Sequence, residues 1–533
     1  MTDTFDFVVV GAGSGGSTLA GRLTEDANTS VALLDAGGPC DNWVVTTPGA
    51  LVLMVARGVN NWCFNTVPQK GLNGRITYQP RGKGLGGSSA INAMIYTRGH
   101  RWDYDHWASL GNAGWAYSDV LPYFKRSENN ADFDGEYHGK TGPLFVNKLR
   151  TDNPLHETFL DAAREAQFRI REDFNGEDQE GLGIYQVTQH NGERWSAARA
   201  YLHPHMASRA NLKVETRAHA TRLLFDGKRA VGVEFRQGNE LKQFRARREV
   251  ILAAGAFQSP QLLMLSGVGD ATTLGRHGIT TIHDLPGVGQ NLQDHADFIF
   301  NYRSDAPHLF GLTLSSIPGQ MRAIGQYWRE RRGMMTTNFA ECGGFLKTRP
   351  ELDVPDIQLH FGMAIVNDHG RKQLFDRGFS CHVCVLRPQS RGSVQLQNAD
   401  PFAAPLIDPN FLGEEADLES LVAGYKLTQR LMDTPAMRAL QKKDLITANV
   451  KTHDDIRAIL RERVDTIYHP VGTCKMGVND PLAVVAPTLK VHGLDALRIV
   501  DASIMPTLIG GNTNAPTIMI AEKAVDMIKA EMR

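Results

Sequence analysis

Several features that mark other protein classes are scarce or missing in this chain of 533 residues. Its six cysteines are too few for a disulfide framework in so long a chain. The 57 basic and 58 acidic side chains nearly cancel, which leaves no overall electrostatic footprint for nucleic acid or an anionic membrane. No apolar run reaches the ~18 residues of a membrane span, and Asp3 and Asp6 stand where a signal peptide would be basic. These absences predict a cytoplasmic protein with a small neutral partner, and they leave peripheral membrane association open.

Signals for other kinds of chemistry are also missing. The chain contains no internal repeat and no G-x-S-x-G elbow of the kind that carries a nucleophilic serine. Cys381 and Cys384 have C-x-x-C spacing, but residues 379–386 form a strand-like run in which positions three apart point to opposite faces. His203 and His205 form an isolated pair without neighbouring carboxylates or thiols. The sequence therefore predicts no metal site.

Glycine, by contrast, is abundant, and its 52 copies gather in discrete clusters. Gly11, Gly13 and Gly16 have G-x-G-x-x-G spacing and follow the apolar run 7–10, which is typical of a strand buried in a parallel sheet. A helix and a second buried run lead to Asp35, about 20 residues after the last glycine, where an acid that binds a ribose is expected. This pattern predicts a dinucleotide-binding unit, and it leaves open whether the nucleotide is FAD or NAD.

Two further glycine clusters predict additional contacts with the nucleotide. Residues 84–89 bring glycines and serines together, so that several backbone N–H groups and two hydroxyls can turn towards one anion. Residues 248–255 lead a buried strand into a glycine, which indicates a third close approach of the backbone to the cofactor.

Three stretches resemble the signatures of the glucose-methanol-choline (GMC) flavin oxidoreductases. Residues 82–92 are similar to the first family signature, residues 255–269 to the second, and residues 288–295 to a further family stretch. The resemblance extends from Phe5 to about Ile528. It implies FAD as the cofactor and an α/β fold, in which a FAD-binding Rossmann-like domain accompanies a discontinuous α+β substrate-binding domain with an antiparallel sheet plus helices.

The resemblance, with a change in composition near residue 298, divides the chain into five segments. They are residues 1–150, the first part of the FAD-binding domain; 151–195, a linking or cap segment; 196–297, the second part of the FAD-binding domain; 298–463, the substrate-binding domain; and 464–533, the C-terminal part of the FAD-binding domain, with the catalytic residues. The cofactor contacts that we expect are Gly11, Gly13, Ser14, Gly15, Gly16, Asp35, Ala36, Trp62, Arg81, Gly82, Gly86, Gly87, Ser88, Asn92, Ala93, Met94, Ile95, Ala220, Ala254, Gly255, Asp501, Ala502, Asn512 and Thr513.

A pair of residues near the C-terminus is expected to carry the chemistry. The resemblance makes His469 the catalytic histidine and Asn512 its partner, a position that is asparagine in some members and histidine in others. An alcohol is too weak an acid to lose its proton unaided near neutral pH, and an imidazole can accept that proton while the flavin N5 takes a hydride. Asn512 would hold the alcohol oxygen by a hydrogen bond and ease the developing alkoxide charge.

Three further expectations concern the surroundings of the flavin. The last helix would begin at Ala515 with Asn514 as its cap and direct its positive dipole end at the flavin. Ile91 stands where some members attach FAD through a histidine, which implies that FAD is bound non-covalently. Glu341 and Tyr468 are the candidate substrate contacts, although Glu341 would serve equally well at a domain interface.

The sequence thus predicts the FAD-dependent oxidation of a primary alcohol to its aldehyde, with oxygen, a quinone or another carrier as electron acceptor. Choline dehydrogenase proper is an alternative, because a site for a cation is not visible in the sequence. A second alternative is an enzyme of the hydroxynitrile lyase type, which keeps FAD without net redox chemistry. A nicotinamide-dependent dehydrogenase is the third class.

Overall fold

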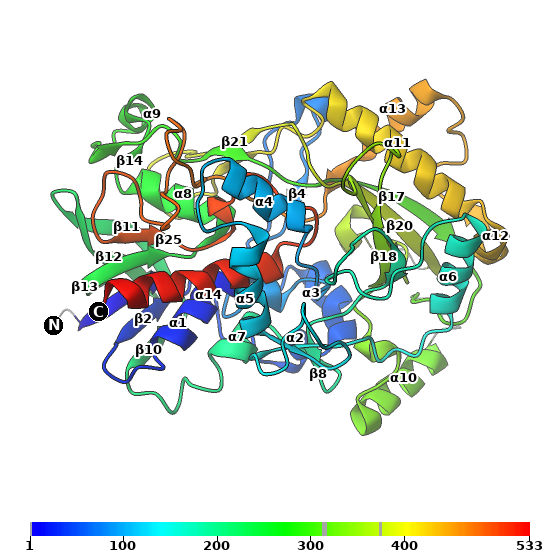
Figure 1. Cartoon of the computed structure of the whole chain (residues 1–533), viewed down its shortest axis with the longest axis horizontal. Helices are drawn as coiled ribbons and strands as arrows, with labels where there is room; N and C mark the ends of the chain where they lie inside the picture. The colour runs from blue at the N-terminus through cyan, green and yellow to red at the C-terminus, as the bar shows by residue number, and fades with distance from the viewer. Residues whose placement is uncertain (1–2, 312–316, 373–375, 533) are drawn as a thin grey trace.

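The protein is described from a computed structural model, which covers residues 3–311, 317–372 and 376–532. Two large sheets lie towards opposite ends of its long axis, and helices surround them (Figure 1). One sheet begins with the N-terminal strand and has seven strands among the described residues, whereas the other has six and is built mostly from the middle of the chain.

The first sheet has the order β10-β2-β1-β13-β12-β11, with β25 beside β13. Its strands are β1 (Asp3–Val10), β2 (Val31–Leu34), β10 (Leu212–Glu215), β11 (Ala218–Asp226), β12 (Arg229–Gln237), β13 (Glu240–Leu252) and β25 (Leu497–Ile499). The strands around β1 run parallel, and β11, β12 and β13 form an antiparallel meander. Residues 7–10 are buried on both faces because helices cover the sheet there, so the predicted first strand is confirmed.

Helices from both ends of the chain cover this sheet. They include α1 (Ser14–Leu23), α4 (Arg101–Ser109), α5 (Tyr117–Ser127), α7 (Ala197–Tyr201), α8 (Gly255–Leu265) and α14 (Asn514–Glu531). Helix α14 packs along α1, although about 490 residues separate them, and Figure 1 shows this red helix beside the blue one. The C-terminal helix therefore reaches the edge of the sheet where the first glycine cluster lies.

The second sheet has the order β18-β19-β20-β17-β23, and β24 pairs with β17. Its strands are β17 (Ala296–Arg303), β18 (Ala340–Leu346), β19 (Ile357–Gly362), β20 (Gly378–Val385), β23 (Lys443–Asp444) and β24 (Asp465–Thr466). All of these pairings are antiparallel. Cys381 and Cys384 lie on β20 in two different hydrophobic clusters, as expected for positions three apart in a strand.

One face of the second sheet is covered by α6 (Leu155–Glu165), α11 (Glu415–Met432), α12 (Pro435–Leu440) and α13 (His453–Arg463). Helix α13 begins at a reciprocal capping box, which Thr452 and Asp455 form. The N-cap of α6 is Pro154, and the side chain of Asn153 accepts a hydrogen bond from the amide of Leu155 at 3.1 Å. In the described part of the chain, no helix combines the length and apolarity needed to cross a membrane.

Candidate active site

A cavity of about 940 Å³ is lined by residues from both sheets and from the glycine clusters. It collects nearly all of the expected cofactor contacts, together with His469, Asn512 and Tyr468. Three expected site residues do not line it: Gly16, Gly86 and Glu341. Segments that are far apart in the sequence therefore meet at one cavity.

The first glycine cluster forms the turn between β1 and α1 because no larger residue fits there. Gly11 has a φ of +96°, and a Cβ at this position would lie 2.5 Å from the carbonyl oxygen of Ala253. A Cβ on Gly15 would lie 2.2 Å from the carbonyl oxygen of Val500. Gly16 lets α1 pack against the end of β1, since a Cβ at this position would lie 1.8 Å from the carbonyl oxygen of Gly11. The helix is thus held close to the strand.

Helix α1 begins at the cavity without a side-chain cap. Its N-cap residue is Gly13, and Ser14 and Gly15 of the first turn line the cavity. The N–H groups of a first helical turn have no partner within the helix, and the helix dipole adds partial positive charge at this end. An anion such as a pyrophosphate can accept hydrogen bonds from these N–H groups and is stabilised by the partial positive charge.

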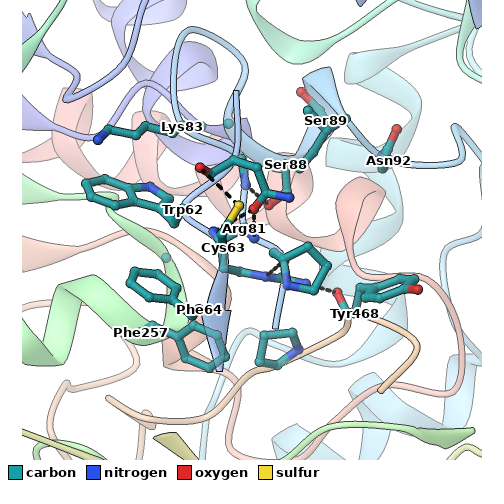
Figure 2. Close-up of a pocket in the computed structure, with 18 of the residues that line it drawn as sticks. Trp62, Cys63, Phe64, Arg81, Lys83, Ser88, Ser89, Asn92, Phe257 and Tyr468 are labelled. Carbon is teal, nitrogen blue, oxygen red and sulfur yellow. Dashed lines mark hydrogen bonds between the residues drawn. The ribbon is translucent and has the colours of Figure 1, made fainter. Parts of the chain in front are cut away.

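The second glycine cluster meets the first at the same place. Gly82, Gly87 and Ser88 line the cavity, and a Cβ on Gly87 would lie 2.7 Å from the Cα of Gly13. Figure 2 shows Ser88 in this loop beside Arg81, whose guanidinium donates to the backbone carbonyl of Tyr468 at 2.8 Å. The two loops therefore offer backbone N–H groups and a hydroxyl to one ligand.

Asp35 lies where β2 ends, and it is already part of a hydrogen-bond network. Its carboxylate accepts from the backbone N–H of Ala12 at 2.9 Å and of Gly37 at 2.8 Å. Burial raises the pKa of this carboxyl, although the backbone N–H groups oppose the change. A ribose hydroxyl can donate to the remaining lone pairs, because a carboxylate accepts about four hydrogen bonds.

The N-terminus of α14 also opens onto the cavity without a side-chain cap. The helix begins at Asn514, and its N-cap is Thr513, so the expectation that Asn514 caps it is wrong. The side chain of Asn514 instead accepts a hydrogen bond from Ser14 at 2.7 Å, which ties the first turns of α1 and α14 together. Two uncapped helix N-termini thus face one cavity, and α14 can stabilise negative charge there.

His469 and Asn512 lie side by side in the cavity wall. Nε2 of His469 is 3.1 Å from Nδ2 of Asn512, and the backbone N–H of His469 donates to Asp294 at 2.9 Å. The oxygen of the Asn512 side chain accepts from Gln358 at 3.0 Å and from Thr97 at 3.2 Å. Because that oxygen already has two donors, the NH₂ group of Asn512 points to the histidine.

A second histidine determines which ring nitrogen of His469 carries the proton. Nε2 of His295 is 3.0 Å from the carbonyl oxygen of Leu386, so this nitrogen must carry a proton and donate it. Nδ1 of His295 is 3.0 Å from Nδ1 of His469. In a neutral imidazole only one nitrogen carries a proton, so Nδ1 of His295 accepts and Nδ1 of His469 donates. Nε2 of His469 therefore has a free lone pair, which accepts from Asn512.

Both rings stay neutral over the physiological pH range. Burial lowers the pKa of His295 to about 3. Burial, together with His295, His360 and Arg81, lowers the pKa of His469 well below its ordinary value. A neutral imidazole with an unprotonated nitrogen at a cavity wall can accept a proton from a ligand hydroxyl.

The cavity wall beside this pair is the face of the second sheet opposite to the one that α6, α11, α12 and α13 cover. His360 and Gly362 on β19 line the cavity, whereas Leu359 and Phe361 alternate into the core. Both ring nitrogens of His360 and the hydroxyl of Ser380, a buried neighbour on β20, lack a hydrogen-bond partner among the described residues. These polar groups are available to a ligand.

Glu341 lies away from this wall. Its side chain is 1% exposed, and Thr151, His156 and Thr337 surround its carboxylate with hydrogen-bond partners. The carboxylate thus joins β18 to α6 and to the segments that carry Thr151 and Thr337, and it does not line the cavity. Tyr468, by contrast, does line the cavity.

Sequence reasoning missed four residues around His469 and Asn512: His295, Gln358 and Thr97, which hydrogen-bond to the pair, and His360, which influences the pKa of His469. A signal was present for two of them, since Gln358, His360 and Gly362 alternate with apolar residues in the strand. The role of His295 depends on a contact across 174 residues, which no local pattern reveals. Among the described residues, no group of three or more acidic, histidine or cysteine side chains is arranged to hold a metal ion.

Comparison with known proteins gives the class that this fold and site define. Models of the GMC oxidoreductase family match residues 5–297 and 388–521. The chain therefore belongs to the GMC oxidoreductase family. It is an FAD-dependent oxidoreductase that acts on CH–OH groups, and the predicted family, fold class and cofactor are confirmed.

Individual relatives are similar over nearly their whole length. The chain is 47% identical to an alcohol dehydrogenase (acceptor) of Pseudomonas putida, over 98% of this chain and 95% of the relative. It is 44% identical to the mitochondrial choline dehydrogenase of Homo sapiens, over 99% and 90%. Among solved structures, the pyridoxine 4-oxidase from Mesorbium loti matches 99% of each chain with a TM-score of 0.89 and 29% identity.

The cavity suits FAD on the evidence of its own atoms. A dinucleotide needs an anion site between glycine loops, and this cavity has two loops in contact and the uncapped N-terminus of α1. A flavin needs an adjoining space lined by apolar and aromatic groups, and Trp62, Phe64 and Phe257 lie to one side of Arg81 there (Figure 2). The donor set therefore fits the cofactor of the family.

Proposed function

We propose that the protein oxidises a primary alcohol to its aldehyde, with His469 as the base that takes the hydroxyl proton. The observation that carries this proposal is that Nε2 of His469 is unprotonated at the cavity wall. The hydrogen bonds through His295 keep the proton of His469 on Nδ1, and the lone pair of Nε2 accepts from Asn512. A general base must reach its proton directly, and His469 lines the cavity beside the amide of Asn512, the hydrogen-bond partner of this nitrogen.

The residues around this nitrogen would each have a defined task. A docking alcohol would give its proton to Nε2 of His469 and accept a hydrogen from the amide of Asn512, so it would insert between these two groups. Thr97 and Gln358 would keep the amide in the orientation that donates. Together these groups position the hydroxyl and ease the charge that develops on its oxygen. FAD, when bound, supplies the two-electron acceptor that takes the hydride from the carbon that bears this hydroxyl.

The N-terminus of α1, the loop of residues 82–88 and Asp35 would hold the pyrophosphate and the adenosine ribose of FAD. The N-terminus of α14 would face the flavin and stabilise negative charge on it by up to ~2 kcal/mol. Ile91 cannot form a covalent link to the flavin, so FAD would be bound non-covalently. Acid precipitation checks this point, and flavin that stays with the precipitated protein would refute it.

The charges of the cavity favour a neutral alcohol over a quaternary ammonium substrate. Three carboxylates line the described part of the cavity: Asp35 and Asp501 accept hydrogen bonds from backbone N–H groups, and Asp376 pairs with Arg303. Glu341 is enclosed elsewhere. A cation in this cavity would thus lack a carboxylate of its own, whereas a neutral alcohol can use the unpartnered His360 and Ser380.

An anaerobic titration of the purified holoenzyme with a panel of alcohols tests the proposal. Primary aliphatic and aromatic alcohols should bleach the flavin absorbance, and choline should do so at much higher concentration. Oxygen is then readmitted, or a quinone analogue added, to identify the acceptor from the recovery of the oxidised spectrum. Flavin that stays oxidised with every alcohol, while a cyanohydrin is cleaved, would instead establish the lyase alternative.

A further inference from the structure

Helix α10 (Ile317–Glu330) carries an exposed apolar stripe that no described residue covers. Ile317 is 50% exposed, Met321 64%, Ile324 38% and Trp328 60%. Their spacing of four, three and four residues places them on one face of an α-helix. Exposed apolar residues scattered singly are ordinary, but four aligned side chains on one helix form a contiguous surface.

A neighbouring face of the helix anchors it to the rest of the molecule. Ala323 and Tyr327 are buried, and the side chain of Gln320 donates to the carbonyl oxygen of Gly311 at 2.7 Å. Figure 1 shows α10 at the periphery of the molecule, away from both sheets and with its outer side unobstructed by other labelled elements. The stripe is therefore held in a fixed orientation at the surface.

The charges beside the stripe are positive. Arg322 and Arg329 each follow a residue of the stripe, lie about 100° further round the helix axis, and are exposed without an ion pair among the described residues. Glu330 is the one acidic residue of the helix. The chain as a whole has a net charge of −1, so this basic character is local and could not be read from the composition.

We propose that α10 binds the surface of an anionic lipid bilayer, with its apolar stripe in the headgroup region. An interfacial helix of this kind combines an apolar face that includes Trp with flanking arginines that meet anionic headgroups. A stable protein interface uses roughly 20 to 30 residues from each partner, far more than the stripe offers. A lipid surface needs only the helix itself, so it is the occupant that this surface fits best.

This placement has a consequence for access to the cavity. Phe310 and Gly311 line the cavity, and Gly311 accepts the hydrogen bond from α10. Lipid-bound α10 would therefore bring this wall of the cavity close to the bilayer, where apolar alcohols and quinones concentrate. The consequence rests on the proposed function, but the binding of α10 to lipid does not.

Sedimentation of the holoenzyme with vesicles tests the proposal. The wild type should bind vesicles of phosphatidylcholine mixed with phosphatidylglycerol, and bind pure phosphatidylcholine more weakly. Met321→Gln/Ile324→Gln/Trp328→Gln keeps helix propensity and removes three of the four apolar side chains of the stripe, so its partition coefficient should fall by about tenfold or more. Arg322→Gln/Arg329→Gln should weaken binding to anionic vesicles by about fivefold for each arginine and reduce its salt dependence.

Matched controls make each outcome decisive. Ile76→Gln/Leu241→Gln removes two apolar side chains that are 59% and 58% exposed elsewhere on the surface, and it should bind vesicles like the wild type. His469→Ala should also bind normally, so a failure of the proposed chemistry would not affect this test. Absent binding by the wild type, or equal losses in the stripe and control variants, would overturn the proposal. So would light scattering that shows a dimer in the wild type and a monomer in the stripe variant.

Discussion

The two sides of the cavity differ in how they are built. The side proposed to bind the nucleotide is mostly backbone: it has glycine turns and two uncapped helix N-termini, and the carboxylate of Asp35 is bonded to backbone N–H groups. The substrate side consists of side chains on one face of an antiparallel sheet and on the segment around His469. Backbone sites tolerate little change in residue size, whereas side-chain sites can vary from one relative to another. This difference predicts that substitutions that add bulk to the glycine turns weaken FAD binding. Substitutions that change the side chains around His469 should instead slow turnover.

The largest effect on cofactor binding should come from the glycine turn. In Gly15→Ala, the new Cβ would meet the carbonyl oxygen of Val500 at 2.2 Å, so α1 must shift away from the cofactor. We expect FAD binding to weaken by about 10- to 100-fold, which corresponds to overpacking strain of about 1–3 kcal/mol. The measurement is the ratio of FAD to protein after gel filtration. Gly275→Ala is the control, since nothing lies within 4 Å of a Cβ at that position. Equal losses of bound FAD in both variants would contradict the steric role of Gly15.

An effect of similar size, on the rate of flavin reduction and not on FAD binding, is expected from the residue that would position the base. His295→Leu removes the acceptor for Nδ1 of His469, so the proton of His469 can move to Nε2 and block the base. Flavin reduction should slow by about 10- to 100-fold while FAD remains bound. His295→Asn places an oxygen near the lost acceptor and should recover most of the rate. Equal rates in the two variants would show that His295 only fills space.

The pH dependence of the reductive step sharpens the assignment of the base. The reactive form of His469 is deprotonated, and its pKa lies well below the ordinary value because the ring is buried beside two other histidines and Arg81. The rate of flavin reduction should therefore stay constant from about pH 8 down to about pH 6, where an ordinary histidine would become protonated. Stopped-flow measurements across this range check the point. An acid limb at or above pH 6.5 would contradict it.

The smallest effect on catalysis is expected at Glu341. Glu341→Gln replaces a buried carboxylate that lies outside the cavity, so KM for an alcohol should change by less than about twofold. The melting temperature should fall by a few degrees, since one or more buried hydrogen bonds are lost at a cost of about 1–3 kcal/mol. Thermal unfolding and steady-state kinetics separate the two effects. A tenfold rise in KM would place Glu341 at the substrate.

Local patterns predicted the nucleotide side well because its signal is short-range. The strand at residues 7–10, the glycines that follow it and Asp35 fall within one βαβ unit, where spacing alone defines the geometry. The fold class and the cofactor followed from the family signatures. The cap of α14 was predicted one residue too late, because Asn514 is engaged with Ser14 of another helix, a tertiary contact that overrides local capping preference.

The substrate side could be predicted only in part. Resemblance pointed to His469 and Asn512 as candidates, but the groups that orient Asn512 come from distant segments: Thr97 lies 415 residues from Asn512, and Gln358 lies 154 residues from it. These contacts arise from the pairing of strands and the packing of loops, which sequence spacing does not encode. The apolar stripe of α10 was likewise hidden, because periodicity shows an amphipathic helix but not which face is buried.

Anaerobic stopped-flow bleaching of the flavin by one primary alcohol, in the wild type and in His469→Ala, is the most direct test of the central claim. The proposed base should make the wild type faster by about 10²- to 10⁴-fold, with FAD bound equally in both proteins. Equal rates of bleaching in the two proteins would contradict the claim that His469 removes the hydroxyl proton.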